Sequence, residues 1–407
     1  MKVAHLVTSF AGDPTLGDDP GDELVDLAAV SRDTAVEPVV VVLGSAGDRW
    51  AITRLRRLDV PVVELGLAPW DPRAVAQTVR ALRGHGVELV HTHGRNADVV
   101  GALAARRLSL SMVSTLYTVE NLPANAADRL GRTAKILLRR RVAARTVAIS
   151  HLQRERYRRF SGTDRGLVVV PNGVLDPVPL QATERERVRR ARAVKPDGLL
   201  AVSAAPMRRG QGQDLLLDAV ASVPASVPLT VVLVGDGPLR PYLASRVEAD
   251  DVLRERVRFE PHAPHDDARE IIGAADLFLH TTRSAALPRP LLRAAGLGVP
   301  AVASHVGGVP EIVNRATGLL VPLNVHAIAD AVVRLGSNDD LRRRLAAGAR
   351  RQFLANFEAL GWAVRLRGVY DEALARVPAE PVGRPVGSGP VTLPPGTYGP
   401  AKTFDSR

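Results

Sequence analysis

The chain has 407 residues, of which 46% are hydrophobic and 24% are charged. This length suits two domains of about 150–200 residues, and the apolar content excludes a chain that is disordered over most of its length. The sequence has no run of about 18 uncharged apolar residues, so a transmembrane helix is not expected, and the absence of cysteine excludes disulfides and thiol catalysis. The N-terminus has the pattern of a β-strand rather than a signal peptide, which predicts a cytoplasmic protein.

The net charge of +11 is concentrated in one segment. Residues 129–159 hold eleven basic side chains and one acidic one, so this segment alone carries +10. Nucleic acid, anionic lipid and an anionic substrate are the candidate partners. Nucleic acid is not expected, because the only aromatic residues there are Tyr157 and, just beyond it, Phe160. Ile136 and Val142 sit among the cations, which favours an anionic membrane surface; a solvated arginine-rich helix face is the alternative.

Short apolar runs alternate with amphipathic helical patterns along the chain. Helical spacing occurs, for example, at 73–83 and 215–221. The expected strands, in chain order, are 1–7, 39–43, 89–90, 146–149, 167–170, 199–202, 229–234 and 277–279. Continuous apolar strands joined through helices are typical of parallel sheets that are covered on both faces. The pattern therefore predicts an α/β protein with doubly wound parallel sheets.

The alternation pauses once, at a charged stretch that contains Pro177 and Pro179. This pause predicts a first domain at 1–176, a linker at 177–197 and a second domain at 198–356. We expect a helix at 357–376 that packs back onto the first domain. The remaining residues, 377–407, are rich in Pro and Gly without a periodic apolar face, which predicts a flexible tail.

A set of segments in fixed order resembles the family 4 glycosyltransferases. These segments are 88–93, 148–150, 170–174, 233–239, 256–259, 274–279, 307–313 and 317–322. The resemblance covers roughly residues 1–375. It implies the GT-B fold, in which two Rossmann-like domains face a central cleft, and it implies transfer of a sugar from a nucleotide-sugar donor to a hydroxyl acceptor with retention. The family needs no metal or other cofactor. Several members act on lipid acceptors, so a lipid-linked acceptor and a peripheral position on the inner face of the cell membrane are expected.

The resemblance also carries site residues onto this chain. His93 matches the histidine beside the donor sugar and is the candidate catalytic residue. Gly235, Gly307, Gly308 and Glu311 lie in segments that match the family. The candidate donor-binding set is completed by arginines that flank or replace family residues: Arg208, Arg209, Arg289 and Arg293. The candidate residues of the acceptor-side loop are Gly12, Gly17 and Asn172. Glycines at such strand ends let backbone N–H groups approach a phosphate closely, although each one alone is more typical of a turn or helix cap.

Five positions depart from the family pattern. Pro206 and Gln211 stand where the family has the Arg and Lys that neutralise the donor diphosphate. Ala285 and Arg293 stand where the family has two Glu, and Arg cannot accept the hydrogen bonds of ribose hydroxyls. Pro288 removes a backbone N–H from a helix start that faces the diphosphate.

These departures leave two hypotheses for function. The first is an active glycosyltransferase with a remodelled donor pocket, in which Arg283, Arg289 and Arg293 form a new anion site. The alternative is a catalytically inactive relative that binds a glycan or nucleotide, or that supports a partner transferase.

Overall fold

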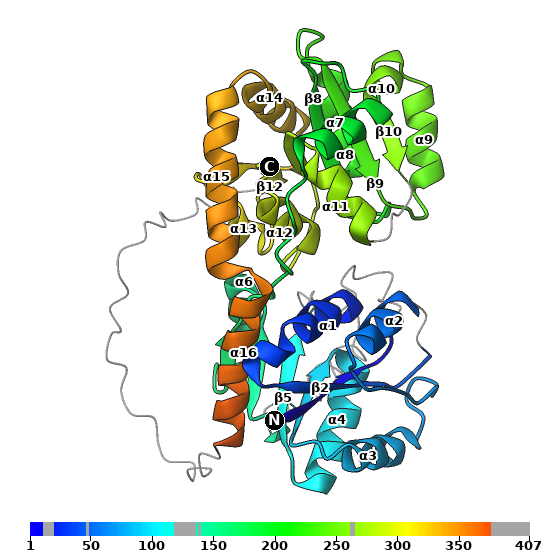
Figure 1. Ribbon diagram of the computed structural model, residues 1–407, viewed down its shortest axis with the longest axis vertical. Helices are drawn as coiled ribbons and strands as arrows, with labels where there is room; N and C mark the ends of the chain where they lie inside the picture. The colour runs from blue at the N-terminus through cyan, green and yellow to red at the C-terminus, as the bar shows by residue number, and fades with distance from the viewer. Residues whose placement is uncertain are drawn as a thin grey trace, which may run out of the picture. The chain divides into compact units, whose positions relative to one another are not determined.

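The computed structural model describes residues 1–10, 20–45, 49–117, 136, 139, 141–260 and 265–375 (Figure 1). Residues 1–374 group into one compact unit. Gly12, Gly17, the predicted tail at 377–407 and much of the basic segment at 129–159 lie outside the described residues.

Two parallel sheets organise the described chain. The first has seven strands in the order β3-β2-β1-β4-β5-β6-β7, and the second has six in the order β10-β9-β8-β11-β12-β13. The strands of the first sheet are β1 (Lys2–Val7), β2 (Glu37–Val42), β3 (Val62–Glu64), β4 (Leu89–His93), β5 (Ser111–Leu116), β6 (Arg145–Ala148) and β7 (Leu167–Val169). Those of the second are β8 (Leu199–Ala204), β9 (Leu229–Val234), β10 (Val257–Glu260), β11 (Leu277–His280), β12 (Ala301–Ser304) and β13 (Gly318–Val321). The prediction of two doubly wound parallel sheets is confirmed.

Helices connect the strands and cover both faces of each sheet. Those up to the end of the first sheet are α1 (Pro20–Ala29), the 3₁₀ helix η1 (Ser31–Thr34), α2 (Arg49–Arg57), α3 (Ala74–Gly84), α4 (Arg95–Leu108) and α6 (His151–Ser161). Those that follow are α7 (Ala182–Ala191), α8 (Gln213–Ser222), α9 (Arg240–Glu248), α10 (Asp251–Arg256), α11 (His265–Gly273), α12 (Arg289–Gly296), α13 (Val309–Ile312), α14 (Val325–Gly336), α15 (Asp339–Asn356) and α16 (Ala359–Leu374).

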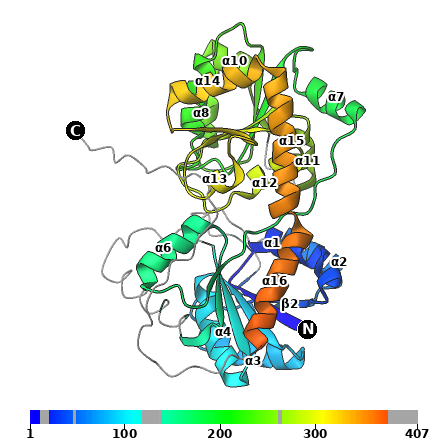
Figure 2. The ribbon, with the colours of Figure 1, turned by 90° about the vertical axis from the view of Figure 1, so that its left-hand side faces the viewer.

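The first sheet is buried on both faces because alternate residues of each strand point to opposite sides. Ala4 and Leu6 of β1 pack with α3 and α4 on one face. Val7 packs with α1 and α2 on the other, and Val3 packs there with α16. Figure 2 shows α16 lying against this sheet, where it contacts α1 and β5. Two apolar faces explain why the strands read as continuous hydrophobic runs.

The second sheet follows the same rule. Leu200 and Val202 of β8 face a core that includes α11, α12 and α15, whereas Leu199 and Ala201 face one that includes α8, α9 and α14. The predicted linker contains α7, whose Val188 packs into the first of these cores and whose Arg189 bonds to Asp276. The domain and linker boundaries stay a prediction, since both sheets fall within one compact unit.

Each sheet has one place where the strand order reverses direction. In the first sheet this place lies between β1 and β4, and in the second it lies between β8 and β11. Ligands of open α/β sheets bind outside the carboxyl ends of the strands at such a switch point. The loops after β1, β4, β8 and β11 are therefore where a functional site is expected.

Candidate functional site

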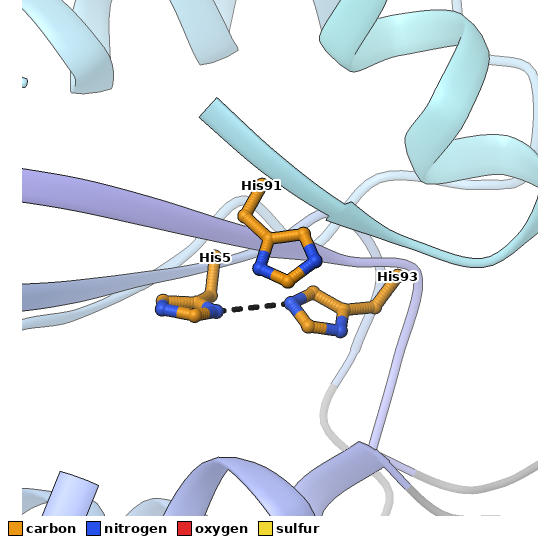
Figure 3. A group of neighbouring side chains, drawn as sticks. All are labelled: His5, His91 and His93. Atoms are coloured by element: carbon orange, nitrogen blue, oxygen red, sulfur yellow. Dashed lines mark hydrogen bonds between the residues drawn. The ribbon is translucent and has the colours of Figure 1, made fainter. Parts of the chain in front are cut away.

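Three histidines lie together at the switch point of the first sheet (Figure 3). The parallel register pairs His5 of β1 with His91 of β4, and Val7 with His93. His91 and His93 are two residues apart in one strand, so their side chains share a face of the sheet, and His5 joins that face from the neighbouring strand. All three are buried, and one ring nitrogen from each lies within 4.8 Å of the others. We call this group the histidine cluster.

A chain of hydrogen bonds leads from Glu23 through Tyr117 and His93 to His5, and the protons along it are assigned from the accepting carboxylate at its start. The hydroxyl of Tyr117 bonds to the Glu23 carboxylate, which only accepts, so the hydroxyl donates. Its oxygen then accepts from the Nδ1–H of His93, 2.6 Å away. Neutral His93 therefore has a lone pair on Nε2, which accepts from the Nδ1–H of His5 at 3.0 Å. Nε2 of His5 is left as a buried lone pair with no hydrogen-bond partner in the described part of the chain.

His91 is held from two sides by hydroxyl groups. Its Nδ1 lies 2.7 Å from the hydroxyl oxygen of Tyr370 in α16, and its Nε2 lies 2.7 Å from Oγ1 of Thr115 in β5. Hydroxyls both donate and accept, so they satisfy either tautomer of a neutral imidazole. The C-terminal helix α16 thus contributes a polar group to the carboxyl end of the first sheet.

Burial keeps the cluster uncharged. It lowers the pKa of His5 to about 3. Burial, reinforced by charge repulsion from the neighbouring imidazoles, lowers the pKa of His91 and His93 well below the usual value. Burial, and then the charge of Glu23, raise the pKa of Tyr117 well above its usual value. At neutral pH these histidines are therefore lone-pair donors and hydrogen-bonding groups, without positive charge for a phosphate.

Two candidate donor-binding arginines of α12 meet acidic residues of α1. Arg289 forms an ion pair with Asp26, and the two side chains are only 8% and 10% exposed. Its Nη1 also donates to the carbonyl of Gly173, 3.2 Å away. Arg293 lies 3.3 Å from Asp22. The structure thus places both arginines against carboxylates of the chain itself.

The electrostatics of this group follow from burial and neighbouring charges. Burial opposes the charge on Arg289, but Asp26, Asp22 and Glu23 together raise its pKa. Burial and the nearby Arg289 lower the pKa of Arg293, and Asp22 opposes that shift. The excess acidic charge of α1 is therefore balanced internally by α12.

Asn172, the described member of the predicted acceptor-side loop, belongs to the same network. Its Nδ2 donates to Oε1 of Glu23 at 2.6 Å, and the side chain is buried. Glu23 therefore links Asn172 to Tyr117 and the histidine cluster.

Arg208 and Arg209 lie in the loop that follows β8, at the switch point of the second sheet. Backbone contacts fix this loop against its neighbours: Met207 N–H donates to the Asp236 carbonyl at 2.8 Å, and Arg283 N–H donates to the Gly210 carbonyl at 2.8 Å. In the described residues neither Arg208 nor Arg209 has a carboxylate partner. Two uncompensated cations at this place can meet an anionic ligand.

Arg283, the third arginine of the predicted anion site, is engaged elsewhere. Its Nη2 lies 3.0 Å from a carboxylate oxygen of Asp214 in α8. Both side chains are nearly half exposed, so this pair lies in solvent and is weakly held.

The candidate donor-site glycines sit where loops approach one another closely. Gly235 has φ +138° and Gly307 has φ +56°, and a Cβ at these positions would collide with the carbonyl oxygens of Ala205 and Ala285. The backbone N–H of Gly308 donates to the Ala285 carbonyl at 3.0 Å. Glycine is therefore required at these positions for loop packing, whether or not a ligand is bound.

Glu311 caps the start of α6. Its carboxylate oxygens accept from the backbone N–H of His151 at 3.0 Å and of Leu152 at 3.2 Å. A helix start exposes unpaired N–H groups and favours negative charge. The carboxylate expected to serve the donor is thus bound by the first sheet's own helix.

Many cations of the basic segment at 129–159 also have partners. Arg139 is buried in an ion pair with Asp98, and Arg145 lies 3.0 Å from Glu372. Arg158 and Arg159 share Glu155, each at 3.0 Å. Among the described residues, no helix is both long and apolar enough to cross a membrane.

Sequence reasoning missed His5, Tyr117 and Asp26. His5 is 86 residues before His91, and only the pairing of β1 with β4 brings the two together. A detectable signal existed: His5 sits in the first strand two residues from its end, as His91 does in β4. Asp26 gave no such signal, because its partner Arg289 lies in the other half of the chain.

Comparison with known proteins assigns both halves of the chain to one kind of enzyme. The model of Glycosyltransferase Family 4 matches residues 24–175, and the model of Glycosyl transferases group 1 matches residues 197–338. The D-inositol 3-phosphate glycosyltransferase of Xylanimonas cellulosilytica is 31% identical over 315 residues, which are 72% of this chain and 73% of that protein. The putative teichuronic acid biosynthesis glycosyltransferase TuaC of Bacillus subtilis is 27% identical over 61% of each chain.

Solved structures agree on the fold. HepE of Anabaena in complex with UDP has a TM-score of 0.79 at 20% identity, and the similarity covers 91% of this chain and 100% of that one. A glycosyltransferase from Rickettsia africae has a TM-score of 0.77 at 18% identity, with 91% and 98% covered. With the two parallel sheets and the matched halves, these similarities show that this chain belongs to the family 4 glycosyltransferases of GT-B fold.

Proposed function

We propose that this glycosyltransferase moves a hexosyl group from a nucleoside-diphosphate sugar to a hydroxyl-rich acceptor, with retention of configuration. We further propose that Arg208 and Arg209 neutralise the donor diphosphate. The observation that carries this assignment is their position: they follow β8 at the switch point of the second sheet and have no carboxylate partner in the described residues. Breaking a glycosidic bond places charge on the leaving phosphate, and fixed cations stabilise that charge.

Arg289 and Arg293, which were expected to bind the donor, have a structural role in this proposal. Each is paired with a carboxylate of α1, so binding a diphosphate there would first require breaking an ion pair. In this proposal they hold α12 against α1 and leave the diphosphate to the loop after β8. Glu311 similarly holds the start of α6.

His93 is the proposed residue beside the donor sugar. It lies at the carboxyl end of β4, and the hydrogen bond that its Nδ1–H donates to Tyr117 keeps the proton on Nδ1. A fixed tautomer and a fixed ring orientation are what a positioned catalytic group requires. We therefore expect His93→Ala to lower kcat more than it changes donor affinity.

The acceptor proposal rests on the relatives and on charge. Two relatives named D-inositol 3-phosphate glycosyltransferase cover 72% and 79% of this chain, and inositol is a ring of hydroxyls. Asn172 and the acidic residues of α1 already pair with other groups of this chain, so an acceptor hydroxyl would have to share those partners. A lipid-linked acceptor reached through the basic segment at 129–159, with the enzyme peripheral on an anionic membrane surface, is the proposed extension.

The test is a calorimetric titration with UDP-glucose, followed by a transfer assay with inositol phosphate as acceptor. Arg208→Ala and Arg209→Ala should each weaken donor binding about tenfold to a hundredfold, because a hydrogen bond to a charged group contributes about 1.5–3 kcal/mol. Arg343→Ala, an exposed arginine on α15, is the matched control and should bind like wild type. The anomeric configuration of the product, read by NMR, tests retention.

Two outcomes would redirect the proposal. Binding without transfer over a range of acceptors favours the alternative, a relative that binds nucleotide without turnover, which the occupied Arg293 and Glu311 also favour. Unchanged donor affinity in both arginine variants would remove the loop after β8 from the donor site. Sedimentation with anionic and neutral vesicles tests the membrane extension, and equal binding to both would end it.

A further inference from the structure

We infer that the histidine cluster is a binding site for a divalent transition metal of the zinc type. The cluster shares His93 with the proposed donor site, and a metal would take the Nε2 lone pair of that residue, so the inference is tested by metal binding and not by sugar transfer. Neutral imidazole nitrogen is the ligand that Zn²⁺, Co²⁺, Ni²⁺ and Cu²⁺ accept readily. Three such groups, all buried and on one face of two adjacent strands, supply three ligands.

The spacing of the two facing nitrogens suits a shared metal. Nδ1 of His5 and Nε2 of His93 lie 3.0 Å apart and point at each other (Figure 3). Two ligands of a tetrahedral zinc ion, each about 2.0–2.1 Å from the metal, are about 3.3 Å apart. A metal enters between these nitrogens if they separate by a few tenths of an ångström and both rings turn so that their lone pairs meet at the ion. A nitrogen of His91, which lies within 4.8 Å of the other ligand atoms, must then move in as the third ligand.

The proton balance of metal binding closes within the cluster. The lone pair on Nε2 of His93 already faces the site. His5 must free its Nδ1, and it does so by moving that proton to its own Nε2, the buried atom that has no partner in the described chain. His5 stays neutral and no net proton is released. Hydrogen bonding within the cluster thus leaves one buried atom, Nε2 of His5, without a partner in the described residues.

The surroundings provide outer contacts for two of the three histidines, His91 and His93, whereas Nε2 of His5 has none in the described residues. A metal-binding histidine usually donates its second ring N–H to another group, which fixes its orientation. His93 donates Nδ1–H to Tyr117, which in turn donates to Glu23. His91 is bonded at both nitrogens, to Tyr370 and to Thr115, so one hydroxyl moves aside and the other remains as the outer contact.

The experiment is a titration of the metal-stripped full-length protein with Co²⁺ alone, followed by visible absorption, and then with Zn²⁺ by calorimetry. Wild type should bind one equivalent and show the intense absorption of tetrahedral cobalt, which Zn²⁺ then displaces. His5→Gln should abolish that absorption. Tyr117→Phe, which keeps the three ligands and removes the outer hydroxyl, should weaken binding about tenfold to a hundredfold.

His280→Gln is the control, because His280 is also a buried histidine in a strand but lies in the second sheet. It should bind Co²⁺ like wild type. The inference is overturned if wild type gives no saturable binding, or if His5→Gln binds as wild type does. Neither readout uses sugar transfer, so failure of the proposed enzyme activity and failure of the metal site are separate results.

Discussion

The carboxyl ends of the two sheets are built in opposite ways. At the first sheet, buried polar groups are paired in a chain that runs from Asn172 through Glu23 and Tyr117 to His93 and His5. At the second sheet, the loop after β8 presents two arginines without carboxylate partners in the described residues. A buried polar network fixes geometry, because each unpaired group would cost the full desolvation energy, whereas solvated cations keep their charge available.

This difference suggests a division of labour within the enzyme. In the proposed function, the first sheet positions uncharged groups with fixed protons, and the second sheet supplies charge for an anionic donor. The ion pairs of α12 with α1 resemble the paired groups of the first sheet, although α12 follows β11 of the second sheet. Single substitutions should therefore have different effects in the two regions.

The largest effect is expected at Asp26. Asp26→Ala leaves Arg289 with its buried ion pair broken, and loss of one partner of such a pair typically costs about 3–5 kcal/mol of the free energy of unfolding. Asp214→Ala breaks the Arg283 pair, which is nearly half exposed, and should cost about 0–1 kcal/mol. Urea unfolding of both variants checks the contrast. Equal losses would show that the Asp26 pair is not the buried, stabilising contact described above.

The next effect is an acid sensitivity that originates in the histidine cluster. The folded pKa of His5 is about 3, below the unfolded value of 6.5, so the unfolded chain binds more protons as the pH falls between these values. Stability is therefore complete above about pH 6.5 and is lost as the pH falls toward 3. Each such histidine should contribute about 1.4 kcal/mol of loss between pH 7.5 and 5.5.

Unfolding of wild type and His5→Gln at the two pH values measures this contribution. The variant should lose about 1.4 kcal/mol less than wild type on acidification, while His280→Gln should behave similarly because burial lowers the pKa of His280 to about 4. Parallel pH profiles for wild type and His5→Gln would mean that His5 is not kept neutral by burial.

The sequence predicts the fold better than the site. Apolar runs such as 229–234 identify strands because burial on both faces leaves no polar positions. Order along the chain places His91 and His93 together, but not His5, which reaches them only through the pairing of β1 with β4. Arg293 and Glu311 could be aligned with a family position, yet their contacts with Asp22 and the start of α6 depend on how distant segments pack. Charge partners across the fold leave no local pattern to read.

A smaller effect is expected at Glu311. Glu311→Ala removes the acceptor for the first backbone N–H groups of α6, and loss of a helix cap costs about 0.5–2 kcal/mol. Glu311→Gln keeps one acceptor oxygen and should recover part of that stability. If Glu311→Ala instead leaves stability unchanged and weakens UDP-glucose binding, the carboxylate serves the donor, and the capping contact is incidental.

The smallest effect on stability is expected in the loop after β8. This loop also tests most directly whether the two sheets use their charged groups differently. Arg208→Ala and Arg209→Ala should change the free energy of unfolding by less than about 0.5 kcal/mol, because partner-less surface groups contribute little to folding. Their donor affinity should nevertheless fall, and that fall should shrink as salt screens the charge. Asp26→Ala should show the reverse, a large loss of stability with a donor affinity close to wild type wherever the variant stays folded. A loss of stability in the arginine variants would mean that the second sheet, like the first, uses its charges to hold the fold together.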